Sequence, residues 1–431
     1  MSVILLKNIK LVDPQADLHH QRVNVIIRNG RIEALGKDVT SEEGTEVDGS
    51  ELSVSYGWMD MQAVLREPGL EHKDTFETLA ASACFGGFTD LAVLPNTTPV
   101  IQYKDDVHYV KSRGEKLPVT LHPLAAVTKD TEGLEITEII DLHHAGAIAF
   151  SDGLHPMWHT GALTKALLYL QRIDGLLINY PDEPELTENR GMHEGVASTM
   201  LGLRGMPAIA EEMAIQRDLN LLRYTGGKMH FSTISTARSV ALIRQAKQEG
   251  LQVTCDIAAH QIAFTDQDLM MFDTNLKVKP PFRPEQDIEA LWKGIEDDTI
   301  DCIVTAHTAH DPECKELEFD YADFGILGLE TAFAVLNTQK PETITLDKLI
   351  QKLTTGPRKV LGLGDARIKV GEAACLTLFH ETAAWTFEKE HIQSLSKNTP
   401  FVGKELTGRA VGIINKGTLE LNKEVREKYL T

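Results

Sequence analysis

The chain has 431 residues, of which 63 are acidic and 43 basic, giving a formal net charge of −20. Hydrophobic content of 42% and charged content of 25% are ordinary for a globular protein with a large core, and the length predicts about two domains. Because nucleic acid and anionic membranes repel a strongly acidic protein at long range, the charge argues against both as main partners.

Cysteine usage and hydropathy predict a reduced, cytoplasmic protein. The five cysteines form no Cys-x-x-Cys pair, and most lie in or beside apolar runs, as buried thiols do. No segment reaches the roughly 18 consecutive apolar residues that a membrane span needs. The apolar run at residues 3–6 is too short for a signal peptide and is typical of a strand.

Short strands are predicted at both ends of the chain. Residues 3–6, 23–27 and 31–35 are β-rich, and Asn29-Gly30 is typical of a two-residue hairpin turn. Residues 374–379, 408–414 and 417–421 have a similar pattern. Two β-rich ends around a different middle predict one small β-sandwich domain assembled from residues 1–55 and 366–431.

The middle of the chain alternates strands and helices. Helix start and stop signals stand between most of the apolar runs, for example Asp74-Thr75 before Gly86-Gly87 and Ser235-Thr236 before Gly250. Eight such units predict an α/β fold, a (β/α)8 TIM-type barrel over residues 56–365, rather than an open doubly wound sheet. The eight β-rich runs are residues 57–64, 89–95, 119–127, 147–152, 176–181, 229–234, 252–258 and 300–307.

Two nucleotide-binding fingerprints are missing. Gly86-Gly87 and Gly226-Gly227 fit neither the dinucleotide-binding pattern nor a P-loop, so the sequence does not support nucleotide binding.

Long motifs identify a family resemblance. They include LREPGLEHKDTFET (65–78), GGFTDLAVLPNTTPV (86–100), LGLRGMPAIAEE (201–212), STARSVALIRQAK (235–247), DTNLKVKPPFR (273–283) and KNTPFVGKELTGR (397–409). Through these segments the chain resembles the dihydroorotases of the amidohydrolase superfamily over almost its whole length. The resemblance implies a barrel whose reacting groups lie at the carboxyl ends of the strands, and a link to pyrimidine biosynthesis.

The same resemblance implies zinc ligands at positions where this chain has other residues. The family's Asp-x-His-x-His is Asp-Met-Gln-Ala-Val here, and three further ligand positions have also changed. Only Asp152 matches a family carboxylate that bridges two metals in one branch. The changed positions are Gln62, Val64, Tyr180, Thr233 and Ala306, the last replacing the aspartate that binds metal and accepts a proton from the attacking water.

These substitutions predict a catalytically inactive relative. Catalytic zinc needs about three His, Cys or carboxylate ligands and an open position for water. Val and Ala offer no donor atom, while Gln and Thr are weak neutral ligands. The sequence therefore predicts no catalytic residue, no zinc and no other cofactor.

The residues that anchor substrate in the family are unchanged. Arg66, Asn96, Asn275 and His310 correspond to the groups that hold the substrate carboxylate. A guanidinium with amide donors suits a carboxylate geometrically. We expect either residual binding of a small carboxylic acid, such as dihydroorotate or carbamoyl-aspartate, or a role for these four residues as hydrogen-bonded framework.

Several alternatives remain open. His260, His307 and His310 with Asp152 could form a displaced metal site, although hydrogen bonding within a polar barrel mouth is the favoured interpretation. His230 is interpreted as a strand residue rather than a ligand. The pairs His19-His20 and His143-His144 are interpreted as surface histidines without a ligand cluster.

The resemblance also suggests two kinds of role. Metal-less relatives assemble with aspartate transcarbamoylase, so the favoured hypothesis is a structural or regulatory partner of that enzyme that also forms a homodimer. The competing hypothesis is an active dihydroorotase or cyclic amidase with a non-standard metal set.

Overall fold

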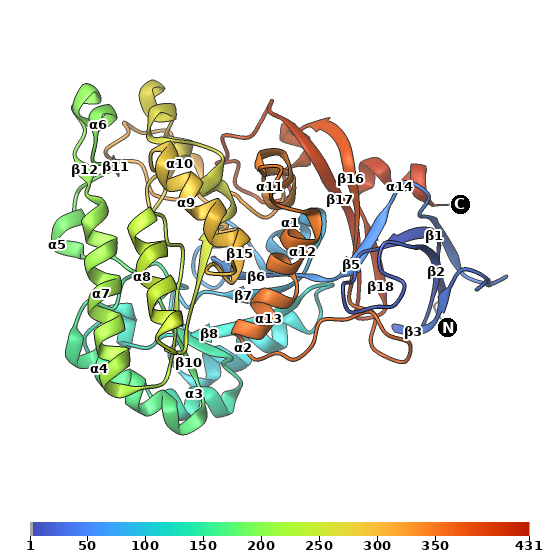
Figure 1. Ribbon diagram of the computed structural model, residues 1–431, viewed down its shortest axis with the longest axis horizontal. Coiled ribbons are helices and arrows are strands. Elements are labelled where there is room, and N and C mark those ends of the chain that lie inside the picture. The colour runs from blue at the N-terminus through green and yellow to red at the C-terminus, as the bar shows by residue number, and fades with distance from the viewer. Residues whose placement is uncertain (1–2, 431) are drawn as a thin grey trace.

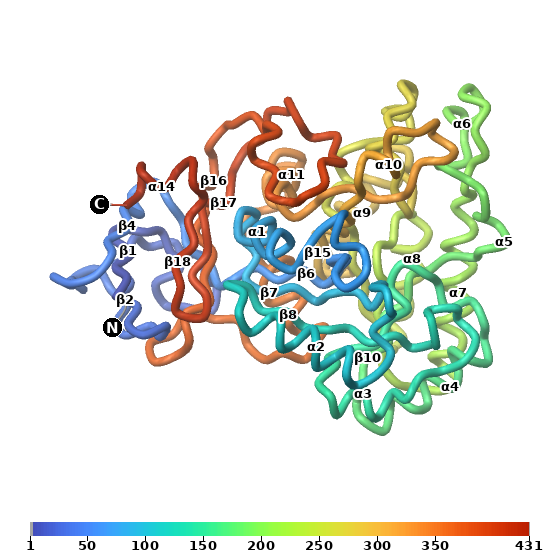
Figure 2. The backbone as a smooth tube through the Cα atoms, turned by 180° about the vertical axis from the view of Figure 1, so that it is seen from behind, coloured from blue at the N-terminus to red at the C-terminus, as the bar shows by residue number. Residues whose placement is uncertain are grey.

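The structure, a computed structural model, describes residues 3–430. A barrel with surrounding helices lies beside a smaller sheet domain that holds both termini (Figures 1 and 2). No helix within residues 3–430 combines the length and the apolar character needed to cross a membrane.

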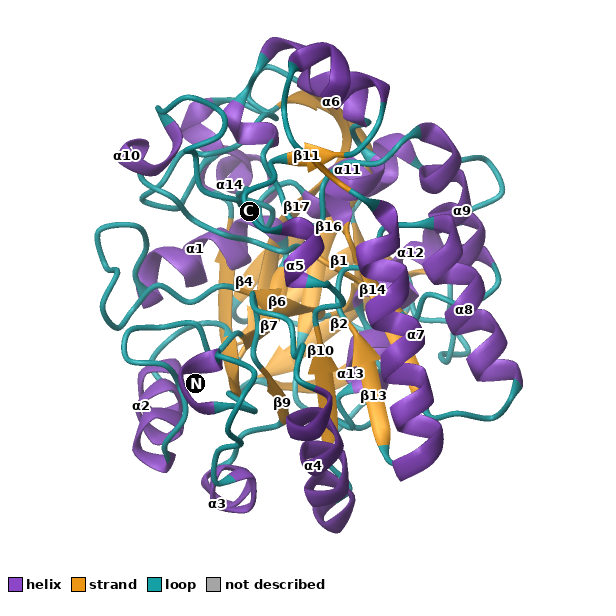
Figure 3. Ribbon diagram, turned by 90° about the vertical axis from the view of Figure 1, so that its left-hand side faces the viewer, coloured by secondary structure: helices purple, strands orange, loops and turns teal. Residues whose placement is uncertain are grey.

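All eight predicted barrel strands are confirmed. They form one parallel sheet in the order β15-β14-β13-β10-β9-β8-β7-β6, surrounded by helices (Figure 3). The strands are β6 (Trp58–Ala63), β7 (Phe88–Val93), β8 (Thr120–Ala125), β9 (Ala149–Ser151), β10 (Leu176–Asn179), β13 (Lys228–Phe231), β14 (Val253–Ala258) and β15 (Cys302–Val304).

The larger helices follow the strands and cover the outside of the barrel. Their starts and stops agree with the sequence: Thr75 and Thr236 cap helices with their hydroxyls, and Gly87 ends the first helix at a φ of 87°. The helices are α1 (Phe76–Gly86), α2 (Lys104–Gly114), α3 (Ile139–Ala145), α4 (Thr160–Leu170), α7 (Ala208–Thr225), α8 (Ala237–Gln248), α9 (Glu285–Glu296), α11 (Ala332–Gln339), α12 (Leu346–Leu353) and α13 (Thr355–Val360).

Short elements lie in the connections of the barrel. In Figure 1, α5 and α6 lie at the side farthest from the sheet domain. These elements are α5 (Pro184–Thr187), β11 (Met192–His193), α6 (Val196–Leu201), β12 (Gly205–Met206) and α10 (Pro312–Lys315).

The expected domain from both termini is also present. Hydrogen bonds join its strands in the order β18-β17-β16-β5-β1-β2-β3, with β4 added beside β1, and β5 pairs antiparallel with β16 to join the two ends of the chain. Asn29 and Gly30 both have positive φ, 50° and 74°, as a tight hairpin requires. The elements are β1 (Val3–Leu11), β2 (Arg22–Arg28), β3 (Arg31–Gly36), β4 (Thr45–Asp48), β5 (Ser53–Tyr56), β16 (Leu376–Thr386), β17 (Glu405–Asn415), β18 (Thr418–Leu421) and α14 (Lys423–Tyr429).

The barrel closes through few contacts between its first and last strands. A β-bridge joins Ala63 to His307, and the Val64 amide donates to the His307 carbonyl at 2.9 Å. The Asp60 carboxylate accepts from the amide and the hydroxyl of Thr305, at 2.8 and 2.6 Å. A side chain therefore replaces part of the backbone pairing at this seam, next to three of the changed positions.

Candidate site at the barrel mouth

Gln62 is held in a chain of hydrogen bonds that crosses the barrel. Its Oε1 accepts from the Ser232 hydroxyl at 2.9 Å, and that hydroxyl lies 3.4 Å from Oδ2 of Asp256. The same Oδ2 is 2.8 Å from Nε2 of His230. The amide oxygen of Gln62 is therefore used for a hydrogen bond within the protein. To serve as a ligand it would have to point at a metal instead.

The pair of His230 and Asp256 lies in the interior of the barrel, and both side chains are almost fully buried. His230 stands opposite Thr254 in the β13–β14 register, and its Nδ1 is 2.8 Å from the Thr254 hydroxyl. The sequence favours a strand residue rather than a ligand at His230, and Asp256 is not among the predicted site residues. The signal was a lone carboxylate within an apolar strand, because a buried carboxylate must have a partner.

Thr233 and Ala306 share an unusual backbone conformation. Their φ angles are 53° and 49°, in the left-handed region that non-glycine residues rarely adopt. The Thr233 hydroxyl is buried and has no hydrogen-bond partner within residues 3–430. Strained backbone of this kind is typical of functional sites. Here the strained backbone occurs at two positions that are poor metal ligands, because Thr233 offers one weak ligand atom and Ala306 none.

Tyr180 occupies a nearly filled space. Its side chain is buried, burial raises the pKa of its phenol, and Nζ of Lys279 lies 5.5 Å from the ring centre. The adjoining cavity, whose walls include Asp182, Glu211 and Arg283, has a volume of about 10 Å³. That is room for about one water molecule.

Asp152 is fixed by hydrogen-bond donors of neighbouring residues. Oδ1 accepts from the amides of Val127 and Thr128, both at 2.9 Å, and Oδ2 accepts from the Thr128 hydroxyl at 2.5 Å. Burial nevertheless raises the pKa of Asp152 to about 6. The carboxylate has the surroundings of a structural hydrogen-bond acceptor.

The four anchoring residues divide into a contacting pair and two separate residues. Nη2 of Arg66 is 3.3 Å from Nε2 of His310, and Nε of Arg66 donates to the Ala309 carbonyl. Asn96 donates to the Asp152 carbonyl and accepts from the Leu154 amide, which uses one of its two N–H groups and one lone pair of Oδ1. The side chain of Asn275 makes no hydrogen bond within residues 3–430.

The surroundings of the Arg66–His310 pair are basic. Lys73 Nζ lies 3.4 Å from Nδ1 of His310, and burial together with Arg66 and Lys73 lowers the pKa of His310 to about 3. A carboxylate of the protein itself, that of Asp323, lies 3.3 Å from Nδ1 of His310 and 3.7 Å from Lys73. Asp323 is half exposed and already occupies one side of this basic group.

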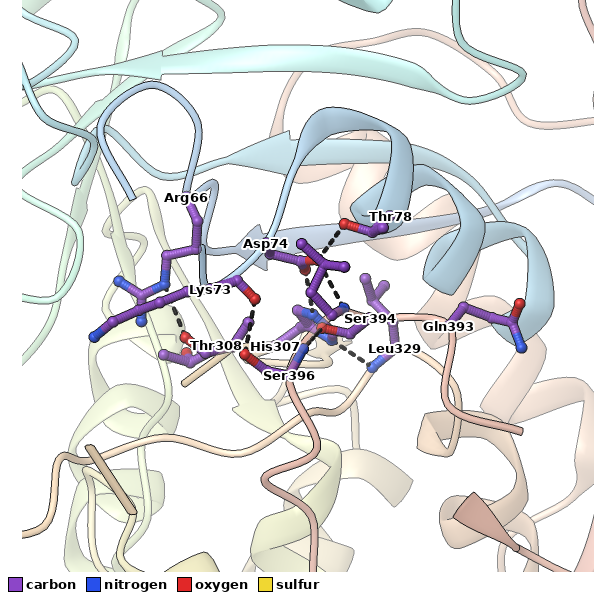
Figure 4. Close-up of polar contacts among 12 residues, drawn as sticks. Arg66, Lys73, Asp74, Thr78, His307, Thr308, Leu329, Gln393, Ser394 and Ser396 are labelled. Carbon is purple, nitrogen blue, oxygen red and sulfur yellow. Dashed lines mark hydrogen bonds and ion pairs between the residues drawn. The ribbon is translucent and has the colours of Figure 1, made fainter. Parts of the chain in front are cut away.

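His307 holds the loops around the barrel mouth (Figure 4). Its Nδ1 accepts from the amides of Gly328 and Leu329, both at 3.3 Å, and its Nε2 faces Oδ2 of Asp74 at 3.6 Å. In the same view the Ser396 hydroxyl donates to the carbonyl of Lys73, so the carboxyl-terminal segment packs against the loop that carries Arg66.

The displaced metal site is not formed. Groups of three side chains that could hold an ion occur at three places within residues 3–430, and none of them includes His260, His307 or Asp152. One includes His310, with Cys314 and Asp323. His260 is buried, and burial lowers its pKa to about 4. The favoured interpretation, that these side chains serve the framework, fits the contacts of His307 and Asp152.

Comparisons with known proteins agree on ancestry. A family model described as dihydro-orotase-like matches residues 52–239, and one for the amidohydrolase family matches residues 192–418. The chain is 36% identical over 423 residues to the dihydroorotase of Caldanaerobacter subterraneus subsp. tengcongensis, covering 97% of each chain. It is 38% identical over 404 residues to that of a Thermoanaerobacter species, covering 93% of this chain and 94% of that one.

A solved structure confirms the fold. The L-hydantoinase (dihydropyrimidinase) from Arthrobacter aurescens superposes with a TM-score of 0.85 at 23% identity, covering 98% of this chain and 97% of the other. At that identity the likeness establishes the architecture alone.

Proposed function

The chain belongs to the dihydroorotase family, and we propose that it keeps the family fold without opening the ring of dihydroorotate. The donor set at the barrel mouth carries this proposal. Gln62 is engaged with Ser232, and Val64 and Ala306 have no ligand atom. The residues present do not fit a catalytic zinc ion, which needs about three strong ligands and an open position.

The loss of the metal removes the nucleophile. Zinc in such sites lowers the pKa of bound water from about 15.7 to about 7, which supplies hydroxide at neutral pH. Ala306 also leaves no carboxylate at the position of the family's general base. The carboxylate of Asp152 remains, but it accepts three hydrogen bonds from Val127 and Thr128.

Residual binding of a small carboxylate is the second part of the proposal. The buried guanidinium of Arg66 and the ammonium of Lys73 flank His310, which its lowered pKa keeps neutral. Two cations and a neutral imidazole suit an anionic ligand such as carbamoyl-aspartate. A ligand would have to displace Asp323, which supports weak binding. Asn96 serves the framework through its hydrogen bonds to Asp152 and Leu154, and its amide keeps one N–H and one oxygen lone pair for a ligand.

We further propose that the chain acts through association, as a structural or regulatory partner of aspartate transcarbamoylase and as a homodimer. Exposed apolar side chains support an interaction surface near α6: Val196 is 71% exposed, Met200 68% and Met271 86%. Contiguous exposed apolar groups are typical of interfaces. The substitutions Met200→Lys and Met271→Lys should abolish co-purification with the transcarbamoylase while leaving the chain folded.

An active hydrolase with a different metal set is the alternative, and one buried cluster within residues 3–430 offers ligand atoms for it. His230, Asp256 and Cys302 each offer a ligand atom within 4.8 Å of the others. All three are at most 1% exposed. A catalytic metal needs an open position that substrate can reach, so a site this deeply enclosed suits a structural ion better than a catalytic one.

Ring opening of dihydroorotate, assayed with zinc in excess, tests the proposal. We expect no turnover above that of buffer with zinc alone. Turnover that disappears in the Cys302→Ser variant but persists in Cys255→Ser would establish the alternative, because Cys255 is equally buried on β14 and belongs to none of the metal-capable groups within residues 3–430.

A further inference from the structure

Two histidines of the sheet domain meet an aspartate of the barrel at the junction of the two parts. His19 and His20 lie between β1 and β2, and Asp347 lies in the first turn of α12. Their Nε2 atoms are 3.3 and 2.9 Å from the same oxygen, Oδ2 of Asp347. We propose that His19, His20 and Asp347 bind a divalent transition-metal ion of the zinc or nickel class. The interpretation of His19-His20 as a surface pair without a ligand cluster did not anticipate Asp347, which the fold brings against both rings.

The geometry suits such an ion. The three ligand atoms all lie within 4.8 Å of one another, and the two imidazole rings lie side by side with centroids 3.7 Å apart. Imidazole nitrogen and carboxylate oxygen bind zinc at about 2.0–2.2 Å, so one ion can contact all three after small side-chain shifts. Three protein ligands leave a coordination position for water.

The charge at Asp347 supports a cation there. Its second oxygen, Oδ1, is buried and has no hydrogen-bond partner within residues 3–430. A buried carboxylate oxygen without a donor is costly, and a bound cation offsets that cost. The next residue, Lys348, does not serve this purpose, because its ammonium is 2.9 Å from both oxygens of Asp298.

An ion can reach the site from solvent. The side chains of His19, His20 and Asp347 are 24%, 44% and 31% exposed. Asp347 also lines a cavity of about 380 Å³ between the sheet domain and α12, with Asp13 and Tyr56 on its opposite wall. This access distinguishes the site from the enclosed cluster of His230, Asp256 and Cys302.

Binding has one identifiable cost. Nδ1 of His19 accepts a hydrogen bond from the Asp13 amide at 3.2 Å, so Nε2 carries the proton of the neutral ring. Coordination through Nε2 moves that proton to Nδ1 and exchanges this long hydrogen bond for a metal–nitrogen bond. The bound ion then links Asp347 to His20 and His19, which are 327 and 328 positions away in the chain. It thereby connects the sheet domain to α12.

Titration of the full-length, chelator-treated protein with zinc chloride, followed by calorimetry, tests this site. We expect one ion per chain in the wild type and a rise in melting temperature with zinc, since an ion that binds only the folded state stabilises it. The variants His20→Gln and Asp347→Asn should lose both effects. The double variant His143→Gln/His144→Gln changes two consecutive histidines on α3, outside the proposed site. It should retain both effects and serves as the matched control.

Two results would overturn the site: no zinc binding by the wild type at millimolar concentration, or unchanged binding in a folded His20→Gln variant. Because the His20 side chain is exposed, this variant remains informative if Asp347→Asn fails to fold. The outcome is separate from the proposed function, which is decided by ring opening and concerns residues at the barrel mouth.

Discussion

The amide oxygen of Gln62 accepts a hydrogen bond from the hydroxyl of Ser232, 2.9 Å away, although the two residues are 170 positions apart in the chain. In the family, position 62 is implied to be a zinc ligand. Here it belongs to the internal structure of the barrel, in a chain of contacts that ends at His230. The interior thus has hydrogen bonds of its own at a position where the resemblance implies a zinc ligand.

Replacement of Gln62 should therefore affect stability. Gln62→Ala removes an acceptor and leaves a small cavity, which should lower the free energy of unfolding by about 1–3 kcal/mol. Chemical denaturation measures this loss. A side chain kept for catalysis would instead leave stability unchanged, and that result would contradict a structural role for the Gln62–Ser232 contact.

Asp152 should make stability depend on pH. Burial raises its pKa from the ordinary value of 3.8 to about 6, so the folded state binds the proton more tightly than the unfolded state. The contribution of this group falls as pH rises from about 4 to about 6 and stays low above that. The free energy of unfolding of Asp152→Asn, taken relative to that of the wild type, should therefore rise by on the order of 3 kcal/mol between about pH 4 and pH 7.

Denaturation of both proteins across that pH range checks the prediction. The difference cancels the other titrating groups, which are common to both chains. A constant difference between Asp152→Asn and the wild type would mean that the carboxylate ionises normally and that its site is more polar than its contacts indicate.

Asn96 and Asn275 should separate framework from ligand binding. Asn96→Ala removes two hydrogen bonds, to Asp152 and Leu154, and should cost about 2 kcal/mol of stability. Asn275→Ala removes none within residues 3–430 and should leave stability unchanged, but it should weaken any binding of carbamoyl-aspartate. Melting curves and calorimetry on both variants distinguish the two roles. A stability loss only in Asn275→Ala, with a binding loss only in Asn96→Ala, would contradict this assignment.

Thr233 should be better replaced by glycine. Its φ of 53° strains a β-branched residue, and its hydroxyl has no hydrogen-bond partner among the described residues, so Thr233→Gly should raise stability by about 1 kcal/mol. The control is Thr236→Ala, at φ −109°, where loss of the cap on α8 should cost about 1 kcal/mol. Destabilisation by Thr233→Gly would show that the threonine side chain has a structural function.

Much of the architecture could be predicted because it is written in local patterns. Apolar runs, caps and glycines predicted all eight barrel strands, both helices named from their signals, and the hairpin at Asn29-Gly30. The family resemblance also predicted five changed ligand positions, and that assignment stays a prediction.

The contacts that decide the site could not be predicted in the same way. His230 meets Asp256 only through the register of β13 with β14, and Asp347 meets His20 across 327 residues. Local periodicity contains no information on either distance. The engagement of Asn96 also depends on the turn after β9, so an unchanged residue did not by itself reveal whether its amide is available.

Anomalous diffraction at the zinc edge, from crystals grown with zinc chloride, decides whether the barrel mouth binds zinc. We expect no zinc peak among Gln62, Tyr180, Thr233 and Ala306. A peak there, bound by three or more side-chain nitrogen or oxygen atoms at about 2.0–2.2 Å, would contradict this expectation and make the chain a candidate hydrolase again.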